Sequence, residues 1–185
     1  MKKGTVWTAC GLLLIAAALC LTLYNLWDNH RASKAAVSAL AQVNMQEQTD
    51  AMRNTQMPTK NIDGYDYVGV LRIPSLRLVL PVMDEWSYPH LKIAPCRYTG
   101  SAYLNNLVIA AHNYDCHFGR LKSLHIGDML TFVDMADNVF VYRVKELETL
   151  SPSAVEDMTN GDWDMTLFTC TVGGQSRVTV RCERV

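Results

Sequence analysis

The amino end of the chain is one long apolar stretch. Between residues 6 and 23 no charged side chain occurs, and the first acidic residue is Asp28. About 20 such residues in a helix cross the roughly 30 Å hydrocarbon core of a bilayer. Trp7 and Trp27 stand where aromatic side chains anchor a span at its two interfaces. A cleaved signal peptide is the competing interpretation, but no convincing Ala-x-Ala cleavage site occurs before Asp28. The pattern therefore favours an uncleaved anchor over residues 6–27.

The next segment, residues 31–53, has the composition of a helix with a thin apolar stripe. It is rich in Ala, Gln, Met, Lys and Glu and contains no Gly or Pro. This predicts a helical stalk, with a partner-binding amphipathic helix as the alternative. Pro58 ends the helix because the residue before a proline avoids the α region. The predicted parts are an amino terminus (1–5), an anchor (6–27), a stalk or linker (28–60) and a folded domain (61–185).

Beyond the stalk the pattern changes to short apolar runs of β-branched and aromatic residues, separated by turn signals. Seven strands with little helix between them predict an all-β domain, either a closed barrel or a sandwich. The predicted strands span residues 67–73, 76–82, 107–111, 129–133, 139–150, 165–170 and 176–182.

Composition excludes several classes of function. The formal net charge of −1 gives no electrostatic case for nucleic acid, and no Gly-rich phosphate loop is present. We expect no cofactor and no bound metal. Six cysteines occur, two of them (Cys10 and Cys20) in the apolar stretch. No disulfide is predicted among the others, because pairing depends on geometry that spacing does not supply.

Three residues suggest acyl transfer. Cys170 ends an apolar strand ahead of two glycines, His112 follows the run 107–111, and Arg177 opens the last predicted strand. A thiolate attacks acyl carbon, an imidazole moves protons, and a guanidinium stabilises an oxyanion. The short spacing between Cys170 and Arg177 fits a hairpin that returns the chain beside the cysteine. His117 is the rival histidine and Arg181, on the same face of the strand, the rival arginine.

Other interpretations of these residues remain open. A strand cysteine is commonly structural, a packed histidine is commonly neutral, and a strand arginine commonly lies on the surface. A zinc site could use His112, Cys116 and His117 with Cys96, although their spacing matches no zinc-finger pattern. Aromatic residues that could line a peptide groove, or equally fill the core, are Trp86, Tyr98, Tyr103 and Phe118.

The residues also resemble a known family. The string TLFTC at 166–170 matches the TLxTC signature of the sortases, the membrane-anchored cysteine transpeptidases of Gram-positive bacteria. NLVIAAH at 106–112 is similar to the strand leading to the family's histidine, and RVTVR at 177–181 to its final strand. YVGVLRIP at 67–74 is similar to its first strand. The resemblance implies an eight-stranded sortase-type β-barrel with short helices, preceded by the transmembrane helix and stalk.

The resemblance also implies a reaction and a location. Cys170 would form a thioester with a secreted protein bearing a C-terminal LPxTG-like signal, His112 would transfer protons, and Arg177 would bind the oxyanion. An amine of a peptidoglycan precursor or of another surface protein would then accept the acyl group. The amino terminus would be cytoplasmic, with the catalytic domain outside the cell membrane. A cysteine peptidase that hydrolyses the same signal, and a non-catalytic membrane-tethered peptide-binding barrel, are the alternatives.

Overall fold

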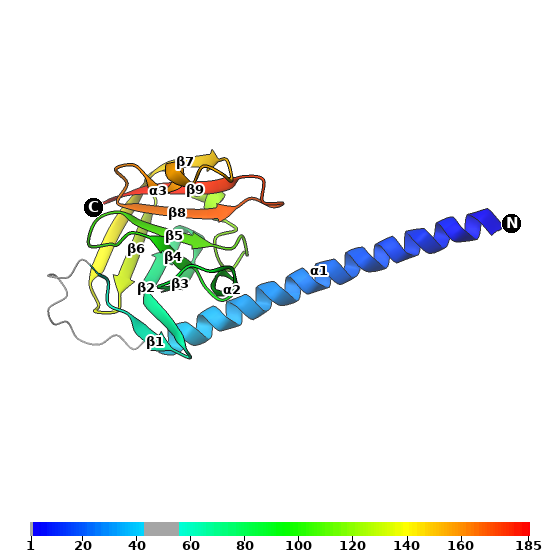
Figure 1. The fold of residues 1–185 in the computed structure, drawn as a ribbon, viewed down its shortest axis with the longest axis horizontal. Helices are drawn as coiled ribbons and strands as arrows, with labels where there is room; N and C mark the ends of the chain where they lie inside the picture. Colours follow the sequence, from blue (N-terminus) through cyan, green and yellow to red (C-terminus); the bar gives the residue numbers. More distant parts are fainter. Residues whose placement is uncertain (1, 43–55) are drawn as a thin grey trace.

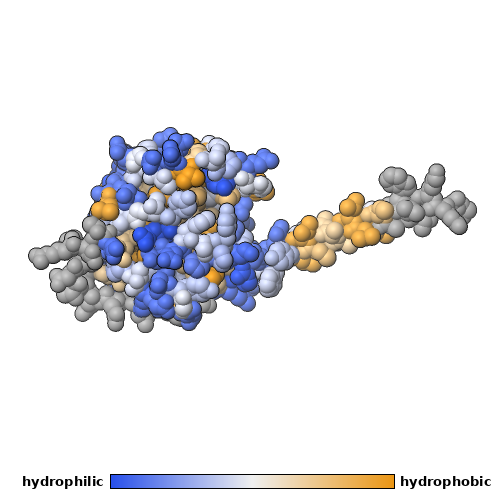
Figure 2. Space-filling view, viewed as in Figure 1, coloured by the Kyte–Doolittle hydropathy of each residue, from blue (hydrophilic) through white to orange (hydrophobic). Residues whose placement is uncertain are grey.

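A long helix precedes the β-domain. The computed structural model of the protein describes residues 2–42 and 56–185. Helix α1 (Lys2–Gln42) projects away from the barrel (Figure 1), and the stretch of it that Figure 2 colours beyond the barrel is mainly apolar. Within the described part of the chain, Cys10–Ala35 is the one segment long and apolar enough to cross a membrane. The predicted anchor and the first part of the stalk thus form one continuous helix. Stalk residues 43–55 lie outside the described residues, and the predicted boundaries stay predictions.

Eight strands close into a barrel. Neighbouring strands follow the order β2-β3-β4-β5-β8-β9-β7-β6, and β6 pairs again with β2, which closes the ring. A short additional strand, β1, pairs with the start of β2. This confirms the predicted eight-stranded all-β barrel. The strands are β1 (Lys60–Ile62), β2 (Tyr65–Ile73), β3 (Leu78–Met83), β4 (Cys96–Thr99), β5 (Leu107–Ala111), β6 (Met129–Asp134), β7 (Val139–Leu150), β8 (Met165–Cys170) and β9 (Arg177–Arg184).

The helices between the strands are short, as expected. They are α2 (Tyr88–Leu91), α3 (Val155–Thr159) and the 3-10 turns η2 (Pro74–Leu76) and η3 (Leu121–Ser123). Most neighbouring strands are antiparallel, but β3 pairs with β4, and β5 with β8, in parallel. The parallel pair β5–β8 matters for function because it brings the carboxyl ends of two strands to the same rim of the barrel.

Apolar side chains cover both faces of β5 and β8. Successive residues of a strand point to opposite faces, so Ile109 and Leu167 fill the barrel interior while Ala110 and Phe168 face outward. The outward cluster is buried too, because residues of α2 and α3 such as Leu91 and Met158 pack on it. Burial on both sides explains why β5 is an unbroken apolar run.

The chain enters the barrel earlier than the sequence predicts. Met57 is buried in the interior cluster, and its sulfur accepts a hydrogen bond from the Ala102 amide at 3.5 Å.

The seam between β2 and β6 requires glycine at position 69. A Cβ built there would lie 2.4 Å from the Val133 carbonyl oxygen and 2.5 Å from Cζ of Phe132.

Candidate active site

Three neighbouring strands bring the predicted site residues into one row. In the parallel pair β5–β8, Ala111 is the partner of Thr169, so His112 and Cys170, the next residues, lie at the same level. In the antiparallel pair β8–β9, Cys170 is the direct partner of Arg177. The Thr169 hydroxyl donates to the Ala111 carbonyl at 2.8 Å and ties the ends of β5 and β8 together. We call these ends, with the start of β9, the rim.

All three side chains belong to the outer face of the barrel. Strand alternation places Cys170 on the face of Phe168, and cross-strand partners share a face, so Arg177 lies on it too. His112 continues the outward series of Ala110 in β5. Each of the three is partly exposed. The structure therefore brings the three residues predicted from the sequence to one face of the barrel, with Cys170 between His112 and Arg177.

The turn between β8 and β9 shapes the rim. Gly173 and Gly174 adopt φ values of 84° and 72°, in the left-handed region that favours glycine. The Thr171 amide donates to the Ser176 carbonyl at 2.9 Å and closes the turn. Arg177 rests on this turn, since Nη1 donates to the carbonyls of Gly174 and Ser176 at 3.2 Å each. Among the described residues, no carboxylate forms an ion pair with Arg177, which leaves its charge available to a ligand.

Arg181 has a different environment. Its side chain is 4% exposed and pairs with Glu148, from Nε to Oε1 at 2.6 Å. Nη1 donates to the Met158 carbonyl and the Thr166 hydroxyl at 3.0 Å each, and Nη2 donates to the Asp157 carbonyl. These partners belong to β7, β8 and α3. Arg181 thus ties α3 to the barrel, and Arg177 is the arginine beside the cysteine.

The two candidate histidines are also distinct. His112 stacks on Tyr114, with ring centroids 4.8 Å apart and an interplanar angle of 28°. Burial lowers the pKa of His112, while the charge of Asp28 opposes that shift and Lys92 adds to it. His117 is fully buried, and burial lowers its pKa to about 4, so the ring is neutral at pH 7. Within the described structure neither of its ring nitrogens has a hydrogen-bond partner. His117 is a packed histidine.

The four aromatic residues proposed for a groove divide into two pairs. Phe118 is fully buried in the barrel interior, and the partly buried Tyr103 packs against the same interior cluster. Tyr98 lies edge-on to Phe168 at 5.3 Å, and Trp86 lies edge-on to Tyr98 at 5.6 Å. A line of aromatic rings thus runs along the outer face, beginning at Phe168, two residues before Cys170 in β8. Tyr88 extends it, 5.2 Å from Trp86 and 70% exposed.

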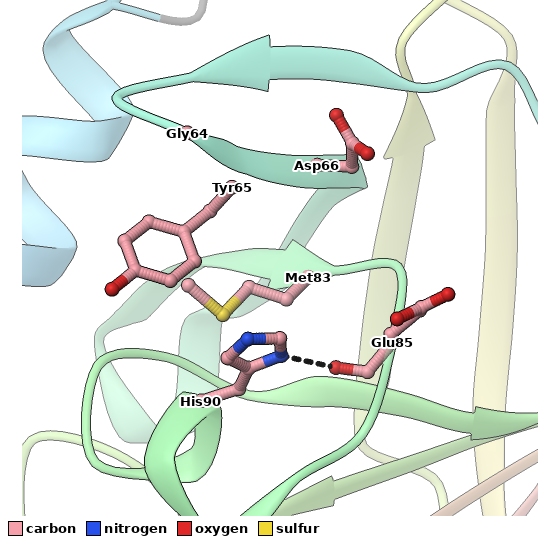
Figure 3. Close-up of a pocket in the computed structure, with 6 residues that line it drawn as sticks. All are labelled: Gly64, Tyr65, Asp66, Met83, Glu85 and His90. Carbon is pink, nitrogen blue, oxygen red and sulfur yellow. Dashed lines mark hydrogen bonds between the residues drawn. The ribbon is translucent and has the colours of Figure 1, made fainter.

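Two pockets lie beside this face. One, of about 440 Å³, is lined by Asp84, Glu85, Trp86, Arg97, Tyr98, Thr99 and Gly100. The other, of about 160 Å³, lies between β2, β3 and α2, where His90 Nδ1 is 2.9 Å from the Glu85 carbonyl oxygen (Figure 3). It is lined by Gly64, Tyr65, Asp66, Met83, Glu85 and His90. Neither pocket is lined by His112, Cys170 or Arg177.

The residues considered for zinc do not form a ligand set. Cys96 is buried in the outer cluster, where burial raises its pKa to about 12. Cys116 donates instead to Asn29, from Sγ to Oδ1 at 3.3 Å. Within the described residues, no group of three or more His, Cys, Asp or Glu side chains could hold a metal ion. All six cysteines are free thiols.

Comparison with solved structures finds the same fold. The sortase D5 transpeptidase of Clostridium perfringens is 23% identical, with a TM-score of 0.63 over 82% of this chain and 96% of that one. Sortase C1 of Streptococcus agalactiae is 24% identical, with a TM-score of 0.60 over 84% and 86%. Sortase C-3 of Streptococcus pneumoniae is 24% identical, with a TM-score of 0.59 over 86% and 84%. At these identities the likeness is one of fold. A comparison with curated proteins finds no match.

Fold and site together define a closed β-barrel with a cysteine, a histidine and an arginine at one rim. The family model of the sortase domain matches residues 71–185, which is more than half of the chain. The chain therefore belongs to the sortase family.

Proposed function

We propose that the protein is a transpeptidase that cleaves an LPxTG-like sorting signal through Cys170 and transfers the acyl part to an amine. The observation that carries this proposal is the row His112, Cys170 and Arg177 on three adjacent strands, on one face, at one rim. Acyl transfer needs a nucleophile, a proton carrier and an oxyanion donor within reach of one carbonyl group. The row supplies all three.

The chemistry follows from this order. The Cys170 sulfur attacks the carbonyl carbon of the residue before the scissile bond, and the Arg177 guanidinium donates to the oxyanion that forms. His112, as the imidazolium, gives its proton to the departing amine, which leaves a thioester on Cys170 and a neutral imidazole. The incoming amine attacks the thioester and His112 takes its proton, so the thiolate and the imidazolium are restored.

The outer face favours an extended apolar peptide. Ala110 of β5 is small, and Phe168 and Tyr98 present rings beside it. We propose that the signal lies along this face with its reactive carbonyl at Cys170. An aromatic floor suits the leucine and proline of such a signal, because both are recognised by apolar contact.

The candidate span supports a membrane location. The β8–β9 turn projects from the barrel on the side toward which α1 runs (Figure 1). With the amino terminus cytoplasmic, this arrangement would turn the rim toward the outer surface of the cell membrane. We propose secreted proteins with C-terminal sorting signals as donors. The acceptor would be an amine of a peptidoglycan precursor or of another surface protein.

The test is intact-mass spectrometry of the full chain in detergent micelles with a small set of LPxTG-like peptides. We expect a mass increase equal to the amino-terminal part of one peptide, absent in Cys170→Ala, retained in the matched thiol control Cys116→Ala, and discharged by an added amine. Discharge by water alone, with the amine unused, would favour the peptidase. A folded protein whose thiol is alkylated but which forms no adduct would favour the peptide-binding barrel.

A further inference from the structure

One turn of α1 docks on the loop that carries His112. The Tyr114 hydroxyl donates to the Asp28 carboxylate, although the two residues are 86 positions apart. Arg31 holds the same carboxylate from the helix side, with Nε at 3.1 Å and Nη2 at 2.7 Å from Oδ1. Ala32, one turn further on, is fully buried. Cys116 adds a contact to Asn29. The helix is thus packed against the barrel immediately after its most apolar part.

The loop itself fixes the Tyr114 ring beside His112. The Tyr114 carbonyl accepts from the amides of His117 and Gly119 at 2.9 Å each, and the His112 carbonyl accepts from the Phe118 amide at 3.1 Å. A Cβ at Gly119 would lie 2.6 Å from the Asn113 carbonyl oxygen, so only glycine allows this tight winding. The ring of Tyr114 therefore has little freedom: its backbone is held by the loop and its hydroxyl by α1.

We propose that Tyr114 and Asp28 are positioning residues for His112, so that the helix bearing the membrane anchor also orients the proton carrier of the active site. This inference rests on the proposed function. Tyr114 acts through the stack of its ring on the imidazole, at 4.8 Å. Asp28 acts by holding the Tyr114 hydroxyl and by placing a negative charge near the imidazole. Both residues act through the imidazole of His112, not on the peptide or on the Cys170 sulfur.

The electrostatic part of the role depends on every charged or titratable group around His112. The Asp28 carboxylate favours the imidazolium, whereas Lys92 and burial of the ring oppose it. Since the imidazolium is the form that protonates the leaving amine, Asp28 increases the fraction of molecules ready to react. Within the described residues, Asp28 and Lys92 act on His112 through their charges, Tyr114 stacks on it, and His117 is coupled to it. Arg31 pairs with Asp28, and Cys170 lies at the level of His112 on the neighbouring strand.

The first test uses Asp28→Asn in the full chain in detergent micelles, because the amide keeps the shape and can still accept from Tyr114. Loss of the negative charge of Asp28 lowers the pKa of His112 further. We expect the acid limb of kcat/KM to move to lower pH and the maximum of kcat/KM to fall about threefold, the size of effect typical of one partly exposed charge. Asp115→Asn is the matched control: it removes an exposed carboxylate from the same loop and should leave both unchanged.

The second test separates the stack from the hydrogen bond. Tyr114→Leu removes the ring and should lower kcat about tenfold with KM unchanged, because the imidazole loses its fixed orientation without any change in peptide contacts. Tyr114→Phe keeps the ring but loses the hydrogen bond to Asp28, so its kcat should lie between those of the native protein and Tyr114→Leu. If both variants turn over at the native rate, or if Asp28→Asn and Asp115→Asn give the same pH profile, the inference is wrong.

A measurement without turnover keeps this inference separate from the proposed function. The imidazole of His112 is titrated by NMR in the full chain labelled with ¹³C histidine, and its signal is assigned with a His112→Gln variant. A lower titration midpoint in Asp28→Asn than in Asp115→Asn supports the coupling even if no thioester forms with any peptide. Equal midpoints would overturn it even in an active transpeptidase.

Discussion

Arg177 and Arg181 lie four residues apart on one face of β9, and their replacement should have different effects. We expect a loss of activity at Arg177 and a loss of stability at Arg181. Arg181 makes an ion pair with Glu148 and three further hydrogen bonds, and its side chain is 4% exposed. Arg177 makes two hydrogen bonds of 3.2 Å to carbonyls of its own turn and is partly exposed. Replacement by methionine keeps most of the apolar stem in each case and removes the charge.

The expected loss at Arg181 is one of stability. Removal of one partner from a buried ion pair costs about 3–5 kcal/mol. Glu148 keeps 28% of its side chain exposed, so water can solvate it once it is alone, and the lower end applies. For Arg181→Met we therefore expect about 3 kcal/mol, equivalent to a fall of roughly 6–12 °C in melting temperature for a domain of this size.

The expected loss at Arg177 is one of activity. Its two hydrogen bonds join a half-exposed side chain to carbonyls that water can reach, so Arg177→Met should cost under about 1 kcal/mol. Loss of an oxyanion donor lowers kcat about 100- to 1000-fold. Both variants are measured in the full chain in one detergent: unfolding by tryptophan fluorescence, and turnover by peptide mass spectrometry at a temperature where each variant is folded.

Two results would contradict these expectations. If Arg181→Met melts within about 2 °C of the native protein, the contacts assigned to its side chain do not hold α3 on the barrel. If Arg177→Met turns over at the native rate while folded Arg181→Met does not, the oxyanion donor is Arg181 and the assignment in the row is wrong.

Three further predictions concern the barrel. Gly69→Ala should cost at least about 2 kcal/mol in thermal unfolding, because its Cβ would meet the Val133 carbonyl; a loss no larger than that of Gly11→Ala, in a helix where the Cβ meets nothing, would contradict this. Met57→Ala should cost about 2–5 kcal/mol by the same measurement, and an unchanged melting temperature would show that residue 57 does not pack in the core. Cys96 and Cys182, whose pKa values burial raises to about 12, should resist iodoacetamide at pH 8 until the protein unfolds, as peptide mapping would show.

Much of the barrel could be predicted because its strands are long and apolar. The runs at 107–111, 139–150 and 165–170 have the observed bounds of β5, β7 and β8. Their apolar residues are buried on one or both faces, so the hydrophobic pattern carries the information directly. The candidate site has a weaker signal: Cys170 and His112 each end such a run, which predicts that they lie at strand ends, whereas their proximity is expected only from the resemblance to the sortases.

Other features of the structure leave no hydrophobic pattern in the sequence. Strand β4 is four residues long and mixes polar with apolar side chains, and it exists because its neighbours pair with it. The contact of Asp28 with Tyr114 joins positions 86 apart through one hydrogen bond, which no periodicity encodes. The entry of Met57 into the core likewise depends on the finished barrel, since a lone methionine beside a proline resembles a linker.

Polar side chains, more than the apolar pattern, determine which residues of β5, β8 and β9 lie side by side at the rim. Because β5 and β8 carry apolar residues on both faces, a slip by one residue would still bury apolar groups, yet it would turn Cys170 into the barrel interior. Two polar contacts oppose that slip: the Thr169 hydroxyl binds the end of β5, and Arg181 binds the Thr166 hydroxyl directly opposite it on β8. The proposed site thus depends on residues that take no part in the chemistry.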